Sequence, residues 1–164
     1  MTKGVILVVD VGNSHTVVGI FRGDKVVDHW RLTTRPNTTS DEVLNRVSGL
    51  LRFSEIKPNQ ITHVGLSTVV PSQERPWIKA LTFLFDKPVQ VVSSDNCLQL
   101  PIAYLNPSMA GSDRLCNVIA LRERGYTDAI IVDMGTATTF DVMKDGGFAG
   151  GLIIPGISAS LDVL

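Results

Sequence analysis

One pattern occurs twice in this chain, and it constrains the fold more than any other feature. Each copy begins at an aspartate that ends an apolar run: DVGNSHT starts at Asp10 and DMGTATT starts at Asp133. Aligned without a gap, the copies pair Asp10 with Asp133, Gly12 with Gly135, Asn13 with Thr136 and Thr16 with Thr139. Matching units this far apart predict two similar domains rather than a short-period repeat array.

The segments around each copy predict an α/β protein. The apolar, β-branched runs 4–10 and 129–134 suit strands that are covered on both faces. Each run is expected to open a three-stranded meander, because two more strand-like segments separated by turns follow it. Further strands are predicted at 63–69 and 89–92, and helices are predicted to begin at Ser40, to include Trp77–Leu84, and to span 112–124.

This distribution of elements places a domain boundary near the helix at 112–124. The first domain, residues 1–115, has a meander followed by two strands and two helices. The second, residues 116–164, has a meander and only the start of another helix. The second domain is therefore expected to be incomplete, and the chain to be truncated.

The residues of each hairpin suit a phosphate ligand. An aspartate that ends a buried strand must be paired or must hold a cation, because burying its charge alone is costly. The glycine two residues later permits a tight turn, and the residues after it offer N–H, hydroxyl or amide donors to phosphate oxygens. One such hairpin is ordinary turn chemistry, whereas two in register predict a cleft that holds a polyphosphate with Mg²⁺ or another cation. Neither a P-loop nor a dinucleotide-binding fingerprint occurs.

The sequence Gly111-Ser112-Asp113-Arg114 marks a helix start. In one interpretation Ser112 or Asp113 only caps the helix. In the other, Asp113 stays ionised beside the positive helix end and accepts a proton from a substrate hydroxyl, while Arg114 holds an anionic group. Glycines 150, 151 and 156 are likewise turn residues, or positions where the backbone approaches a nucleotide.

Charge and cysteine content limit the partners and the compartment. The formal net charge is −1 and basic residues are scattered, so neither nucleic acid nor an anionic membrane is an expected partner. Cys97 and Cys116 have no metal-type spacing and are expected to be free thiols in a reducing compartment. No apolar run reaches the length of a membrane span, so a cytoplasmic protein is predicted.

Taken together, the motifs resemble those of the type III pantothenate kinases. The resemblance covers the whole chain and rests on four motifs in order: DVGNSHTVVG from Asp10 to Gly19, Tyr104 and Asn106-Pro107 ahead of Gly111–Arg114, DMGTATTFD from Asp133 to Asp141, and GGLIIPG from Gly150 to Gly156. It implies a ribonuclease H-like (actin-like ATPase) fold with duplicated domains.

The resemblance also implies roles for individual residues. ATP would be bound by Asp10, Val11, Gly12, Asn13, Ser14, His15, Thr16 and Val17, with Thr136 as a further contact. Pantothenate would be bound by Tyr104, Gly111, Ser112, Asp113 and Arg114, with Asp113 as general base. Asp133 would hold a monovalent cation, K⁺ or NH₄⁺, while Mg²⁺ accompanies ATP and the protein forms a homodimer.

Two departures from the family keep other functions open. The family supplies a further substrate-binding threonine beyond the position where this sequence ends, and Ser112 replaces a common alanine. The leading hypothesis is phosphorylation of pantothenate by ATP. The alternatives are a catalytically impaired nucleotide-binding fragment, an accessory transcriptional regulator of the same family, or a nucleotide-switched chaperone or filament subunit with the same fold.

Overall fold

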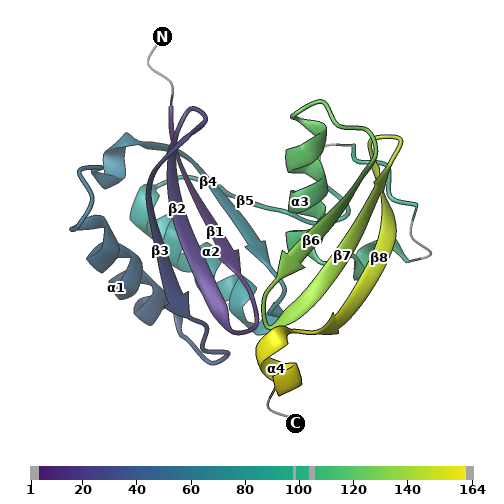
Figure 1. The fold of residues 1–164 in the computed structure, drawn as a ribbon. Helices are drawn as coiled ribbons and strands as arrows, with labels where there is room; N and C mark the ends of the chain where they lie inside the picture. Colours follow the sequence, from purple (N-terminus) through teal and green to yellow (C-terminus); the bar gives the residue numbers. More distant parts are fainter. Residues whose placement is uncertain (1–3, 98, 104–105, 162–164) are drawn as a thin grey trace. The chain divides into compact units, whose positions relative to one another are not determined.

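The computed structural model describes residues 4–97, 99–103 and 106–161, without the side chains of 108, 158 and 159. These residues form two compact units, one ending at Val91 and the other beginning at Val92. Each unit has its own sheet and its own core, and each is described by itself (Figure 1).

The first unit is a mixed five-stranded sheet with two helices. Its strands stand in the order β3-β2-β1-β4-β5. Strands β1 and β2 pair antiparallel, as do β2 and β3, while β4 runs parallel to both β1 and β5. Its elements are β1 (Val5–Val11), β2 (His15–Arg22), β3 (Lys25–Thr33), α1 (Ser40–Leu51), a 3₁₀ turn (Pro58–Gln60), β4 (Ile61–Thr68), α2 (Pro71–Phe85) and β5 (Val89–Val91).

The core of the first unit is apolar and lies on one face of its sheet. Alternate residues of β1, from Val5 through Leu7 and Val9 to Val11, are buried because a strand turns successive side chains to opposite faces. Residues of the two helices, including Val47 and Leu81, complete this core. Helices α1 and α2 also contact each other, as Figure 1 shows.

Helix α1 begins with a capping box. The amide of Glu42 donates to Thr39 Oγ1 at 3.3 Å, and the amide of Thr39 donates to Glu42 Oε2 at 2.8 Å. Two amides that the helix itself leaves without a partner are thereby satisfied. The helix start predicted at Ser40 is confirmed.

The second unit is a three-stranded antiparallel sheet in the order β6-β7-β8, with helix α3 packed on β7 and β8. Its elements are a 3₁₀ turn (Pro107–Met109), α3 (Ser112–Arg122), β6 (Ala129–Met134), β7 (Ala137–Lys144), β8 (Gly147–Pro155) and the short helix α4 (Ile157–Leu161). Its core joins Leu115 and Val118 of α3 to Met143 and Phe148 of the sheet.

The segment before α3 packs in the second unit. Cys97, Leu100 and Ala110 share a core with Phe148, and the amide of Phe148 donates to the carbonyl of Pro101 at 2.8 Å. The compact units therefore divide between residues 91 and 92, whereas the expected domain boundary falls between 115 and 116.

The predicted strands and helices are present, but two expectations about burial are wrong. In β1 the second face is only half-buried at Ile6 and Val8. In β6 the side chains of Ile130 and Val132 are 71% and 44% exposed, because the described helix α3 packs on the other face of this sheet. An apolar run alone does not distinguish a strand covered once from a strand covered twice.

Candidate functional site

The first hairpin lies at the carboxyl end of β1. Asp10 pairs with Val17 of β2 and with Ser67 of the parallel strand β4. Strands β2 and β3 lie on one side of β1 in the sheet, whereas β4 and β5 lie on the other, so the strand order reverses between β1 and β4. Ligands of open α/β sheets bind at the carboxyl ends of the strands at such a point. This placement independently favours the Asp10 hairpin as a binding element.

The turn of this hairpin is tight. The amide of Gly12 donates to the carbonyl of His15 at 3.0 Å, and a Cβ on Gly12 would lie 3.0 Å from the same oxygen. Thr16 and Thr34 share a hydrogen bond of 2.8 Å between their hydroxyls, and the amide of Thr34 donates to the carbonyl of Ser14. The loop is thus held by β2 and by the residue that follows β3.

The predicted ATP-binding residues of this hairpin differ in what they expose. Asp10, Asn13 and His15 are exposed, whereas the side chains of Val11 and Thr16 are buried. The remaining three, Gly12, Ser14 and Val17, are half-buried. The exposed residues are the ones whose side chains can reach a ligand; Val11 and Thr16 support the loop.

The second hairpin is one residue shorter than the first. Asp133 pairs with Thr139, and Met134 pairs with Thr138, whereas Asp10 pairs with Val17 and Val11 with Thr16. The structural counterpart of Thr16 is therefore Thr138, not Thr139 as the ungapped alignment gives. Like Thr16, Thr138 is buried. A shift of one residue exchanges the faces of a strand, so Thr16 and Thr139, which the ungapped alignment pairs, lie on opposite faces of their strands.

Asp133 and Thr136 are exposed in this hairpin. The expectation that Asp133 is buried is wrong. Because Asp133 is exposed, its charge does not require a cation to compensate it. Among the described residues, no group of three or more His, Cys, Asp or Glu side chains gathers as a metal site. The exposed carboxylate of Asp133 still fits a cation that binds oxygen atoms and takes its other ligands from phosphate and water.

The start of α3 carries the candidate base. Gly111 is the N-cap and has no side chain with which to cap, so the expected capping by Ser112 or Asp113 is not observed at the N-cap position. Asp113 lies in the first turn, where its Oδ1 accepts the amide of Arg114 at 2.8 Å. Asp113 is half-buried.

Arg114 lies in the core of the second unit. Its Nε donates to Oδ1 of Asp141 in a salt bridge, and its guanidinium lies 5.1 Å from the centroid of the Phe148 ring. Arg114 is 8% exposed and Asp141 is fully buried. Burial raises the pKa of Asp141, and the hydrogen bond and charge of Arg114 oppose that rise.

Asp141 had no predicted role, although it closes the motif DMGTATTFD. Its position on β7 gave one signal: it is a charged residue within a strand whose neighbours Phe140 and Val142 are apolar. Its partner lies 27 positions away in the chain, and only the packing of α3 on the sheet brings the two together.

The glycines of GGLIIPG pack against the protein itself. A Cβ on Gly151 would overlap the carbonyl oxygen of Phe140 and lie 2.5 Å from Arg114 Nη2. A Cβ on Gly156 would lie 2.5 Å from the carbonyl oxygen of Thr136, which accepts the amide of Gly156 at 3.0 Å. These contacts account for both glycines without a nucleotide.

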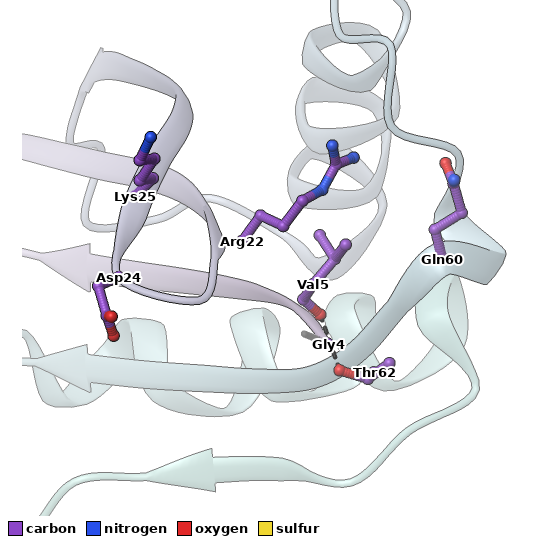
Figure 2. A pocket seen from close by; sticks show the side chains of 7 residues that line it. All are labelled: Gly4, Val5, Arg22, Asp24, Lys25, Gln60 and Thr62. Atoms are coloured by element: carbon purple, nitrogen blue, oxygen red, sulfur yellow. Dashed lines mark hydrogen bonds between the residues drawn. The ribbon is translucent and has the colours of Figure 1, made fainter. Parts of the chain in front are cut away.

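Tyr104 lies outside the described residues. An open pocket of about 740 Å³ lies near Val5, at the opposite end of β1 from Asp10, so it is not the predicted phosphate site. It is lined by Gly4, Val5, Arg22, Asp24, Lys25, Gln60 and Thr62. Figure 2 shows the side chains that line it.

Within the described part of the chain, no helix combines the length and the apolar character needed to span a bilayer.

Solved structures with the actin-like ATPase fold are similar to this chain along nearly its whole length. One is a Campylobacter jejuni protein described as a Baf family transcriptional activator. It aligns with a TM-score of 0.56 and 17% identity, over 96% of this chain and 58% of its own. At this identity the likeness concerns the fold alone, and it agrees with an α/β fold built on a mixed sheet.

The family is established by sequence. The profile of the type III pantothenate kinase family matches residues 6–164, and the chain belongs to this family. Type III pantothenate kinases from Desulfosudis oleivorans and Desulfotalea psychrophila are 41% and 43% identical, each over 97% of this chain. The chain spans 63% and 62% of the length of these two relatives.

Proposed function

We propose that the protein transfers the γ-phosphoryl group of ATP to the primary hydroxyl of pantothenate, giving 4'-phosphopantothenate and ADP. The observation that carries this proposal is Asp113: a half-buried carboxylate in the first turn of α3, inside the segment that matches the family. Relatives about 40% identical over nearly the whole chain bear the name of this activity.

The proposed chemistry assigns one role to each element. Asp113 accepts the proton of the pantothenate hydroxyl as its oxygen bonds to the γ-phosphorus. The bond between the γ-phosphorus and the bridging oxygen breaks, and ADP leaves with that oxygen. The Asp10–Val17 hairpin and Thr136 bind ATP, while Gly111–Arg114 and Tyr104 form the pantothenate pocket.

Cations belong to the same proposal. Asp133 offers an exposed carboxylate to K⁺ or NH₄⁺, and Asp10 offers one on the side of the ATP loop. Bound Mg²⁺ would neutralise charge on the phosphates of ATP. We further propose that the protein is a cytoplasmic homodimer built from duplicated actin-like ATPase domains, of which residues 116–164 begin the second.

A regulatory role without turnover is the competing proposal. A structure with the same fold is described as a transcriptional activator, and nucleotide binding alone would suffice for such a role. Fold likeness cannot separate the two, because one fold carries many functions.

The test is an assay of the full-length protein with ATP, Mg²⁺ and K⁺. We expect ADP release that depends on pantothenate, with a product heavier than pantothenate by one phosphoryl group in mass spectrometry. Activity should fall when Na⁺ replaces K⁺ at equal ionic strength. ATP binding without pantothenate-dependent turnover would favour the regulatory role. Equal rates in Na⁺ and K⁺ would contradict a monovalent cation site at Asp133.

A further inference from the structure

The most unusual contact in the second unit is a buried ion pair that touches the candidate active site. Asp141 lies within β7 with no exposed surface, and its Oδ1 accepts from Arg114 Nε. Asp141 Oδ2, Arg114 Nη2 and Thr139 Oγ1 are also buried, and none has a hydrogen-bond partner of ordinary geometry among the described residues. A charged group buried with so few partners requires an explanation beyond packing.

Arg114 is fixed on three sides. Asp141 holds its Nε, the Phe148 ring lies 5.1 Å from its guanidinium carbon, and Gly151 leaves space where a Cβ would lie 2.5 Å from Nη2. A guanidinium over an aromatic face is attracted by the ring, and more so when both are removed from water. The side chain of Arg114 is thus immobilised on β7 and β8.

The same residue orients the candidate base. The backbone amide of Arg114 donates to Asp113 Oδ1 at 2.8 Å. A chain of contacts therefore runs from Asp141 on β7, through the side chain and backbone of Arg114, to the carboxylate of Asp113. Asp141 itself is buried and cannot touch a substrate.

Stability is a poor explanation for this pair. Buried ion pairs gain little over apolar side chains of similar volume, because both charges lose their hydration. An apolar pair here would also remove two of the three buried polar atoms that lack partners, Arg114 Nη2 and Asp141 Oδ2. A fixed direction for the guanidinium, in contrast, needs a charged and hydrogen-bonding partner.

Resting on the function proposed above, we propose that Asp141 is a positioning residue: by holding Arg114 it fixes the first turn of α3 and the carboxylate of Asp113. Burial raises the pKa of Asp141, and the nearby charge of Asp113 raises it further. Asp141 holds Arg114 by a direct hydrogen bond. Its loss should therefore slow the chemical step while leaving ATP binding intact.

Three variants of the full-length protein test this role. D141N removes the charge and keeps the shape. R114M/D141L replaces the whole pair with apolar side chains of similar length, and preserves folding if D141N does not. D145N is the matched control, since Asp145 is exposed in the turn between β7 and β8 at φ 51°, which asparagine tolerates.

Two measurements separate positioning from structure. The first is kcat with the KM values for ATP and pantothenate. The second is hydrogen exchange of the amides of residues 112–117 without substrate, together with the midpoint of thermal unfolding. In D141N we expect kcat to fall about 10- to 100-fold, KM for ATP to stay within about twofold, and exchange at the start of α3 to quicken.

The double variant decides between the explanations. R114M/D141L should regain the unfolding midpoint of the wild type without regaining its slow exchange at 112–117; kcat is compared only for D141N and D145N, because Arg114 also belongs to the proposed pantothenate pocket. Recovery of both the midpoint and the slow exchange would show that the pair only supports folding and would overturn the proposal. In D141N, a raised KM for pantothenate with unchanged exchange would also overturn it, because Asp141 would then affect substrate binding without fixing the start of α3.

Failure of the proposed function gives a different result. If the wild type shows no pantothenate-dependent turnover, the kinase assignment fails, but the exchange measurement still stands. Quicker exchange in D141N and not in D145N would then support the positioning of the α3 start by Asp141, and equal exchange in all variants would refute it.

Discussion

The two units carry related hairpins on differently built supports. In the first, Asp10 stands at the end of a strand whose inward face is entirely apolar, backed by α1 and α2. In the second, the core beneath β7 includes the charged pair Arg114 and Asp141 beside Phe148. The difference indicates that the first unit is organised for stability, whereas the second accepts the cost of buried charge in the neighbourhood of Asp113.

The two sheets also differ in how far the face away from the core is covered. The outward side chains of β1, Ile6 and Val8, are half-buried. On the second sheet Ile130, Met134 and Leu152 are each about two-thirds or more exposed, at 71%, 72% and 67%. In the described part of the chain, this face of the second sheet is therefore less covered than the outward face of β1.

The apolar core of the first unit predicts the largest effect of a single substitution. Leu7→Ala removes a side chain with no exposed surface, and we expect a loss of about 2–5 kcal/mol in the free energy of unfolding. Urea unfolding measures this loss. Ile6→Ala, on the half-buried face of the same strand, is the control; an equal loss in both would contradict a one-sided core.

Close backbone packing in the second unit predicts the next effect. Gly151→Ala places a methyl group on the carbonyl of Phe140 and 2.5 Å from Arg114 Nη2, so a loss near the upper end of about 1–3 kcal/mol is expected. Gly135→Ala is the matched control, because its Cβ would meet Ala137 O at an ordinary 3.5 Å. If Gly151→Ala unfolds no more readily in urea than Gly135→Ala, the β7–β8 packing described above is wrong.

The capping box of α1 predicts a smaller and pH-dependent effect. Thr39→Ala should cost about 1 kcal/mol at neutral pH, with Thr39→Ser retaining most of the stability. Hydrogen bonds from the backbone and then the side chain of Thr39 lower the pKa of Glu42. The stabilisation by ionised Glu42 is therefore present above its ordinary pKa and is lost as the pH falls through the lowered value.

Urea unfolding of the wild type and Thr39→Ala across the acid range measures this dependence. The difference between the two should shrink as the pH falls. A difference that does not change with pH would show that Glu42 takes no part in the cap.

Gly49→Ala should produce the smallest change, and in the opposite direction. Gly49 lies within α1 and nothing stands within 4 Å of the position of its Cβ. Alanine should raise the free energy of unfolding by about 0.5–1 kcal/mol, since glycine loses more conformational freedom in a helix. A loss of stability in thermal unfolding would show a crowded helix surface at this position.

Local patterns predicted much of this structure, and tertiary contacts account for what they missed. The hairpins at Asp10 and Asp133 and the start of α3 were predictable because turn and helix-start chemistry lies within a few residues. The register of the second hairpin was not, since the ungapped alignment hid the one-residue difference that pairs Met134 with Thr138. The exposure of Asp133 was missed because AIIVDM has the composition of a buried strand, whatever covers it.

The candidate site shows the same division between what local sequence predicts and what tertiary contacts decide. Asp113 was predictable from Gly111–Arg114, because the four residues are contiguous. The burial of Arg114 was not, since it depends on Asp141, Phe148 and Gly151, all far along the chain. Sequence patterns identify residues that carry chemistry more readily than the residues that hold them in place.

The central claim is that Asp113 acts as a general base on pantothenate, and its most direct test is Asp113→Asn in the full-length protein. This change keeps the shape of the side chain and removes its ability to accept a proton. We predict that pantothenate-dependent ADP release falls by about 10²-fold or more, with ATP binding unchanged and with D145N close to the wild type. Turnover near the wild-type rate in Asp113→Asn would contradict the account and leave Asp113 as a residue that only stabilises the start of α3.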